Sequence, residues 1–307
     1  MKTSSKSKNV ALVLSSGGAR GLAHIGVIEE LQARGYNITS VAGSSMGALV
    51  GGLFAAGKMN EFRDWIITLN KKDVISLIDF TLTTKGFVKG EKVFERMRKL
   101  NLIPEINIED LAIPYTAVAV DILNNNEYVF RSGSLLKAIR SSISIPSVFT
   151  PVNVESGLLV DGGVLDPLPL KHVSRTANDL LIAVDLNAFI PYDKPKLPSK
   201  KVVEENHNEK TSVLIQKWDE LFGHNHNSKQ KKPTEIKSNK IGYIDLLARS
   251  VLLMQSKLTA YSAELIPPDV LIPISKDSST VFEFYKAEEL IAYGKEMCAK
   301  LLDRKGL

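Results

Sequence analysis

The stretch ITSVAGSSMGALVGGLFAAG, residues 38–57, decides how this chain folds. Its first five residues are rich in β-branched side chains, which favours a strand. The run that begins at Met46 is small and apolar and ends at Gly57, a residue type that commonly terminates helices. Strand, tight turn and helix form the context that a G-x-S-x-G nucleophile elbow requires. The sequence therefore predicts a strained turn that exposes the hydroxyl of Ser45 beside the free N–H groups of a helix start.

A second strand, loop and helix precede this stretch. Residues 10–14 are continuously aliphatic, which is typical of a strand buried in a parallel sheet. Residues 15–21, SSGGARG, form a tight loop, after which apolar residues recur at helical spacing until Gly35. The chain thus opens as βαβα. This opening predicts a three-layer α/β fold in which helices flank a mainly parallel central sheet.

The chain continues this pattern until its composition changes near residue 191. We expect further strands over residues 113–122, 127–131, 157–160, 179–186 and 269–274. We expect further helices over residues 134–142, 243–265 and 286–302. The last helix holds Cys298 among apolar neighbours, which indicates either a core helix or a contact between copies in a homo-oligomer.

Residues 191–240 are dense in Lys, Asn, Pro and Ser. We interpret them as a polar insertion or lid within a single α/β hydrolase domain over residues 8–307, preceded by a flexible N-terminus at residues 1–7. One piece of the insertion, residues 212–222, has an amphipathic pattern. Two hypotheses follow: a peripheral membrane contact through residues 193–240, or a helix that packs on its own domain.

Charge and composition exclude several classes of protein. The net charge is +5, and residues 193–240, with eleven Lys and seven acidic residues, supply +4 of it. The remainder is nearly neutral, which argues against a nucleic-acid-binding face. A single cysteine cannot form an internal disulfide, so we expect a reducing, cytoplasmic location. The apolar run after Lys8 is too short for a signal peptide, and no run approaches the roughly 18 residues of a membrane span.

The glycine loop allows three interpretations. A dinucleotide-binding turn would need an acidic residue about 20 positions further on, and residues 36–42 contain none. An oxyanion hole would use the backbone N–H groups of Gly17 and Gly18, because residues without a Cβ let the backbone approach a developing negative charge. The third interpretation is a turn that only brings helix and sheet together. His24, in the helix after the loop, fits a core or helix-surface position.

The histidines fit a conventional Ser–His–Asp triad poorly. His24 precedes Ser45, and His172 lies in a segment with the pattern of an ordinary helix. The remaining three histidines fall in the polar insertion. We therefore expect a carboxylate to activate Ser45 directly, which requires a dry, close-packed pair. Asp161 ends an apolar strand and enters a glycine turn; other aspartates at or near strand ends are Asp121, Asp166 and Asp185.

Three motifs now stand in order: SGGARG at residues 16–21, GSSMG at residues 43–47 and DGG at residues 161–163. Together they closely resemble the patatin-like phospholipase family, especially its compact bacterial members. Residues 17–31 are similar to the first loop and helix of that family, and residues 141–151 to its proline-containing segment before the aspartate strand. The resemblance covers roughly residues 8–190.

The resemblance implies a lipid acyl hydrolase with a Ser–Asp dyad at the carboxyl edge of a patatin-type α/β fold. Ser45 is then the nucleophile, Asp161 the base, and Gly17 and Gly18 the oxyanion hole; Ser16 stands where the family has the first of three glycines. The supporting motif residues are Arg20, Gly21, Gly43, Gly47, Gly162 and Gly163.

The expected substrate is a phospholipid or lysophospholipid ester, and we expect neither cofactor nor metal, because no cluster along the sequence has metal-ligand spacing. A short-chain esterase, a thioesterase, an acyltransferase and a non-enzymatic adaptor stay open as alternatives.

Overall fold

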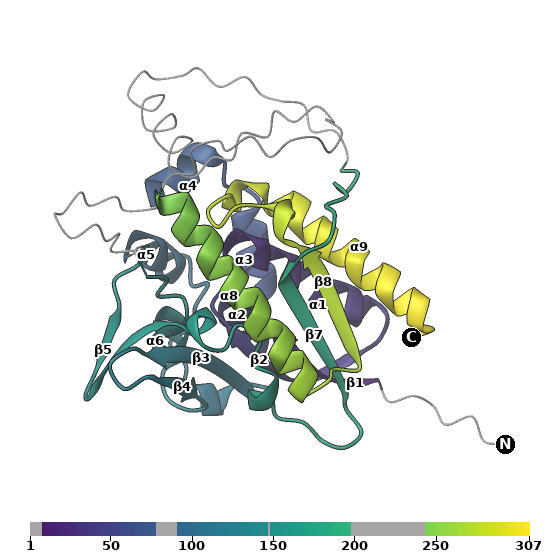
Figure 1. The fold of residues 1–307 in the computed structure, drawn as a ribbon, viewed down its shortest axis with the longest axis horizontal. Coiled ribbons are helices and arrows are strands. Elements are labelled where there is room, and N and C mark those ends of the chain that lie inside the picture. Colours follow the sequence, from purple (N-terminus) through teal and green to yellow (C-terminus); the bar gives the residue numbers. More distant parts are fainter. Residues whose placement is uncertain (1–7, 78–90, 147, 198–242) are drawn as a thin grey trace.

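The computed structural model describes residues 8–77, 91–146, 148–197 and 243–307 (Figure 1). Its strands form one eight-stranded sheet. They are β1 (Asn9–Leu14), β2 (Asn37–Ser44), β3 (Tyr115–Asp121), β4 (Asn126–Phe130), β5 (Val152–Val154), β6 (Gly157–Asp161), β7 (Leu180–Ala188) and β8 (Val270–Ser275). Pairing within β3–β2–β1–β7–β8 is parallel throughout, whereas β4 and β6 run antiparallel to β3, and β5 antiparallel to β6. The predicted fold, a mostly parallel sheet flanked by helices, is confirmed.

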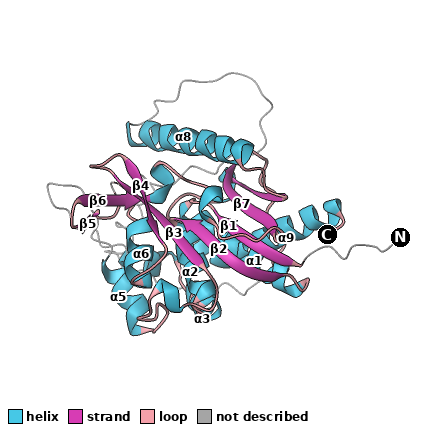
Figure 2. Cartoon of the chain, turned by 90° about the horizontal axis from the view of Figure 1, so that it is seen from below, coloured by secondary structure: helices cyan, strands magenta, loops and turns pink. Residues whose placement is uncertain are grey.

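Helices cover both faces of the sheet. The described helices are α1 (Ala23–Ala33), α2 (Met46–Ala55), α3 (Met59–Ile66), α4 (Lys71–Leu77), α5 (Glu91–Lys99), α6 (Leu135–Ser142), α8 (Tyr243–Leu265) and α9 (Ala287–Lys305). Figure 2 shows α8 on one face of the sheet and α1, α2 and α6 on the other. None of these helices is long and apolar enough to cross a bilayer.

The alternation of side chains along β1 divides the core in two. Val10, Leu12 and Leu14 point into the large cluster beneath α1, α2 and α9, while Ala11 and Val13 join the smaller cluster on the opposite face. Successive side chains of a strand point to opposite faces, so a strand buried on both sides must be apolar throughout. Burial on both faces therefore explains why residues 10–14 are aliphatic without interruption.

One edge of β3 brings two distant strands end to end. Val118 pairs with Ser44 of β2, and the next residue, Ala119, pairs with Asp161 of β6, while β4 pairs with both from the opposite edge. Since β2 and β6 run in opposite directions along the same edge of β3, their carboxyl ends meet. The residue after β2 and the last residue of β6 are therefore neighbours in space.

Most of the expected elements are found within a few residues of their predicted bounds, and the helix over 243–265 has the predicted bounds. Cys298 is fully buried in the core. The expected ordinary helix around His172 is wrong, because that segment is a 3-10 turn of three residues, Leu170–His172. The short helices α3, α4 and α5 were not predicted from the sequence. Residues 198–242, which include most of the polar insertion and the amphipathic piece at 212–222, lie outside the described residues.

Candidate active site

Ser45 occupies a strained turn between β2 and α2. Its backbone has φ 53° and ψ −122°, a combination that residues with a side chain rarely adopt. The turn is tightly packed: a Cβ on Gly47 would lie 2.0 Å from the carbonyl oxygen of Leu14, and one on Gly43 would lie 2.3 Å from that of Gly47. The glycines of the motif are thus required by close backbone approach.

Asp161, the last residue of β6, is hydrogen-bonded directly to Ser45. The hydroxyl of Ser45 donates to Oδ2 of Asp161 at 2.5 Å, and the N–H of Gly163 donates to Oδ1 at 2.8 Å. Both side chains are buried, at 2% and 3% exposure. Burial raises the pKa of Asp161 to about 7, although the hydrogen bonds from Ser45 and Gly163 oppose the shift. A carboxyl group with this pKa can accept and return a proton near neutral pH.

Ser142 supports this pair from α6, and the sequence reasoning did not identify it. Its hydroxyl accepts a hydrogen bond from the N–H of Ser45 at 2.9 Å and donates to the carbonyl of Val118 at 2.6 Å. Ser142 therefore ties the strained turn to β3. The only signal in the sequence is the polar pair Ser141-Ser142 at the end of an otherwise amphipathic helix.

The glycine loop follows β1 and enters a 3-10 helix, Gly18–Leu22. Gly18 has φ 56°, and a Cβ there would lie 2.8 Å from the carbonyl oxygen of Val281. The N–H groups of Ser16 and Ala19 donate to the carbonyls of Pro167 and Val281. Those of Gly17 and Gly18 have no acceptor in the described part of the chain, and Gly18 lines the pocket that holds Ser45.

The three sequence motifs pack against one another through their glycines. A Cβ on Gly21 would lie 2.3 Å from Cβ of Met46, which opens α2. A Cβ on Gly163 would lie 2.7 Å from Oγ of Ser16, and one on Gly162 would lie 2.6 Å from Oγ of Ser44 in the elbow. The loop, the elbow and the aspartate turn thus form one compact unit.

Arg20 anchors the glycine loop. Its buried guanidinium donates to the carbonyls of Leu186 and Ser279 and to Oδ1 of Asn187, at 2.8–3.0 Å. Burial lowers its pKa to about 10, while Asp185 and Asp277 raise it in part, so Arg20 stays protonated. Its donors are engaged by the scaffold, which makes Arg20 a structural residue of the loop.

The other candidate bases do not reach Ser45. His24 is buried, its Nε2 pairs with the carbonyl of Ser15 at 2.9 Å, and burial lowers its pKa to about 4. The carboxylate of Asp121 accepts hydrogen bonds from the side-chain amide of Asn124 and from the N–H of Leu158. The carboxylate of Asp185 accepts from the N–H of Asn187, and burial raises the pKa of Asp185.

His172 and Asp166 lie beside Glu127. Within the described residues, Asp161 is the carboxylate bonded to Ser45.

An apolar pocket of about 870 Å³, including its opening, begins at Ser45 and Gly18. Its other walls are aliphatic, aromatic or thioether side chains from α2 to α5 and the turns between them, and from Ile143, Ile145, Phe149, Val281, Phe282 and Phe284. They include Leu49, Phe62, Trp65, Phe94, Met97, Ile145, Phe149, Phe282 and Phe284. A cavity of this composition favours a hydrocarbon group over a polar one.

Ser45 and Asp161 thus form a buried, hydrogen-bonded pair on a mostly parallel sheet, beside a glycine loop and an apolar pocket. Residues 12–173, which contain all three motifs, match the family model described as patatin-like phospholipase. This chain belongs to that family, which confirms the resemblance seen in the sequence.

Curated relatives agree with this assignment. An uncharacterised NTE family protein of Mycobacterium tuberculosis is 34% identical over 97% of this chain and 92% of its own length. Lysophospholipase NTE1 of Scheffersomyces stipitis and neuropathy target esterase sws of Drosophila melanogaster are each 30% identical over 187 residues. These two matches cover 58% and 59% of this chain but only 12% and 13% of the longer proteins.

A solved structure shares the fold. The crystal structure of VipD from Legionella pneumophila aligns with a TM-score of 0.50 over 97% of this chain and 67% of that chain, at 15% sequence identity. At this identity the likeness concerns the fold alone.

Proposed function

We propose that this protein hydrolyses fatty acyl esters of phospholipids or lysophospholipids through an acyl-serine intermediate. The observation that carries the proposal is the 2.5 Å hydrogen bond from the Ser45 hydroxyl to buried Asp161. Family membership supports lipid hydrolysis in general. The site suggests which residues perform it.

Asp161 acts first as general base. It takes the proton of Ser45 as Oγ attacks the ester carbonyl, and the carbonyl oxygen becomes an oxyanion. Asp161 then returns this proton to the leaving alkoxide, which departs as the alcohol. In the deacylation step, a water molecule gives a proton to Asp161 and attacks the carbonyl of the acyl-serine. Asp161 then returns the proton to Oγ of Ser45 as the fatty acid leaves, which restores the Ser45 hydroxyl.

The N–H groups of Gly17 and Gly18 stabilise the oxyanion. Neither N–H group has an acceptor among the described residues, and Gly18 shares the pocket wall with Ser45. Donors that are preset around the developing charge need no reorganisation during the reaction.

The apolar pocket supports a long acyl chain as the substrate group. Each buried methylene contributes about 0.8 kcal/mol of binding, so a pocket lined by hydrocarbon side chains discriminates by chain length. A short-chain esterase, a thioesterase or an acyltransferase would use the same dyad, but the pocket favours the long-chain ester. We further propose a cytoplasmic location. Residues 193–240 would either contact a membrane peripherally or pack on their own domain, and liposome co-sedimentation with and without this segment distinguishes the two.

Activity-based labelling tests the assignment. A fluorophosphonate probe should label the wild type and not Ser45→Ala, and Asp161→Asn should lose nearly all turnover. Ser141→Ala is the matched control, because Ser141 is a buried serine on α6 whose hydroxyl only donates to the carbonyl of Lys137. Labelling that persists in Ser45→Ala would refute the assignment.

Substrate preference is tested separately. Purified wild type and Ser45→Ala should be compared on mixed lipids, with acyl esters of graded chain length and an alcohol as alternative acceptor. We expect free fatty acid from long-chain substrates. Preference for short chains or transfer to the alcohol would favour the alternatives.

A further inference from the structure

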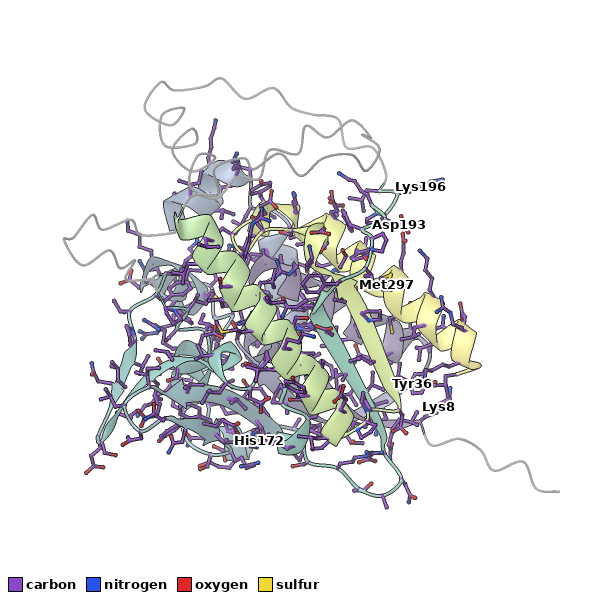
Figure 3. The ribbon with its side chains drawn as sticks, in the orientation of Figure 1. Lys8, Tyr36, His172, Asp193, Lys196 and Met297 are labelled. Atoms are coloured by element: carbon purple, nitrogen blue, oxygen red, sulfur yellow. The ribbon has the colours of Figure 1, made fainter. Side chains whose placement is uncertain are left out.

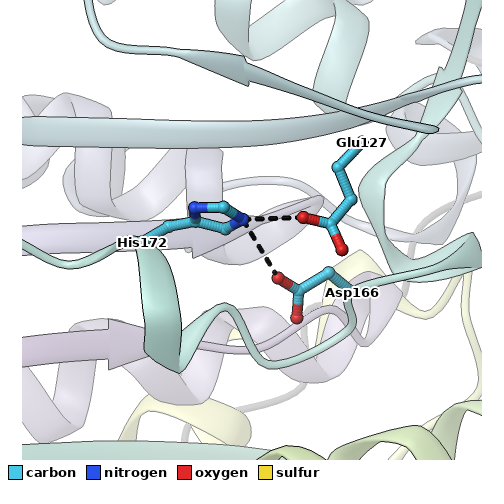
Figure 4. A group of neighbouring side chains, drawn as sticks. All are labelled: Glu127, Asp166 and His172. Carbon is cyan, nitrogen blue, oxygen red and sulfur yellow. Dashed lines mark hydrogen bonds and ion pairs between the residues drawn. The ribbon is translucent and has the colours of Figure 1, made fainter.

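The side chains of Glu127, Asp166 and His172 converge on one another (Figure 4). Glu127 lies on β4, Asp166 follows the Asp161 turn, and His172 ends a 3-10 turn. Nε2 of His172 lies 2.8 Å from Oε2 of Glu127 and 3.6 Å from Oδ2 of Asp166, and one potential ligand atom of each residue lies within 4.8 Å of the others.

Asp166 is the unusual member of this group. It is 3% exposed, and its Oδ2, which faces His172, has no hydrogen-bond partner in the described part of the chain. A buried carboxylate oxygen without a donor is costly, because it has lost its water and gained nothing in return. His172 does not supply the missing donor, since its Nε2 is already closer to Glu127.

We propose that Glu127, Asp166 and His172 bind a divalent metal ion of the Zn²⁺ class through Oε2, Oδ2 and Nε2. One imidazole and two carboxylates are ligand types that Zn²⁺ accepts. In a tetrahedral site with bonds of about 2.1 Å, neighbouring ligand atoms are about 3.4 Å apart. The spacings of 2.8 and 3.6 Å around Nε2 bracket this value, so small side-chain rotations form the site. Water completes the coordination.

Two cationic side chains border the proposed site. Nζ of Lys171 donates to Oε1 of Glu127 at 2.7 Å and leaves Oε2 for the metal. NH2 of Arg131 lies 3.2 Å from Nδ1 of His172. Coordination through Nε2 moves the imidazole proton to Nδ1, so Arg131, which is exposed, must turn away. Arg131 therefore competes with the metal, and its removal should strengthen binding.

Metal binding would join three parts of the fold. The ion would link β4 to the segment between Asp161 and His172. In that segment the N–H of Asp166 donates to the carbonyl of Gly162, and the carbonyl of Pro167 accepts from Ser16 in the glycine loop. The ion would thus fix the segment between Asp161 and His172 relative to β4 and the glycine loop. It would do so without contacting the substrate.

Equilibrium dialysis of the metal-free full chain against Zn²⁺, with metal analysis and thermal unfolding, tests the proposal. Wild type should bind one equivalent at this site and gain melting temperature with Zn²⁺, because a ligand that binds the folded state stabilises it. Asp166→Asn and His172→Gln should each weaken binding about tenfold or more and lose the thermal gain. Arg131→Gln should bind more tightly than wild type.

Histidines elsewhere provide the matched control. A double variant, His224→Gln with His226→Gln, removes two histidines from the polar insertion at residues 191–240. It should leave Zn²⁺ binding at the Glu127–Asp166–His172 site unchanged. Circular dichroism of each variant establishes that it is folded. The proposal is overturned if the wild type binds no Zn²⁺, or if folded Asp166→Asn and His172→Gln bind it as the wild type does. An Arg131→Gln variant that binds no more tightly contradicts the displacement of Arg131.

Discussion

Replacing Ser142 by Ala tests how the strained turn of Ser45 is held. The hydroxyl of Ser142 accepts from the N–H of Ser45 at 2.9 Å and donates to the carbonyl of Val118 at 2.6 Å, and all three groups are buried. The substitution leaves the N–H of Ser45 without its partner, which costs about 1–3 kcal/mol, and removes a second bond worth about 1 kcal/mol. The expected loss of stability is therefore about 2–4 kcal/mol.

Two assays measure this effect. In a domain of 307 residues each kcal/mol lowers the melting temperature by about 1.5 °C, so Ser142→Ala should melt at least about 3 °C below wild type. Because Ser45 is no longer tied to β3, the reacting hydroxyl is displaced, and kcat should fall about tenfold to a hundredfold.

Ser141→Ala is the neighbouring control. Its hydroxyl donates to the carbonyl of Lys137 within the same helix, so its loss should cost less than about 1 kcal/mol and leave kcat unchanged. Equal melting temperature and kcat for Ser142→Ala and wild type would refute the reasoning.

Three further predictions concern the base, the loop and the pocket. Asp161 must be ionised to accept a proton and its pKa is raised to about 7, so kcat/KM should rise with pH through about 7 and level off above it; a flat profile from pH 5 to 9 would exclude this base. Gly18→Ala should lower kcat on the order of 10²–10³, because φ at Gly18 is positive and a Cβ there would clash with Val281. Gly57→Ala is the control: its φ of 67° gives comparable backbone strain, but nothing lies within 4 Å of its Cβ position, so kcat should be unchanged. Ile145→Trp puts a larger side chain into the pocket wall. If room for two methylenes is lost, kcat/KM for long-chain esters should fall about tenfold relative to kcat/KM for short-chain esters. An unchanged ratio of the two values would place the acyl chain elsewhere.

The local pattern of the chain predicted much of the fold. Continuous aliphatic runs, helical spacing and terminating glycines depend on neighbours in sequence, so β1, β2, α2 and α8 could be recognised. The direction of β6 could not. The apolar pattern of its five residues is compatible with either a parallel or an antiparallel strand. Its direction is set by its pairing with β3.

The candidate site divides in the same way. Ser45 and the glycines lie in local motifs whose geometry the sequence encodes. The choice of Asp161 over Asp121, Asp166 and Asp185 stayed open in the residues themselves, because it depends on β2 and β6 meeting along β3. Ser142 was missed for the same reason, since it acts through a contact with a residue 97 positions away. The Glu127–Asp166–His172 group also has no sequence spacing that reveals it.

Trapping the acyl-enzyme tests the central claim most directly. Wild type and Ser45→Ala are mixed with a long-chain lysophospholipid, quenched in acid within the first turnover, digested and analysed by mass spectrometry. The account predicts that the wild-type peptide containing Ser45 gains the mass of the acyl group, and that Ser45→Ala yields neither this adduct nor fatty acid. Fatty acid released by wild type without any acylation of Ser45, or at an undiminished rate by Ser45→Ala, would contradict it.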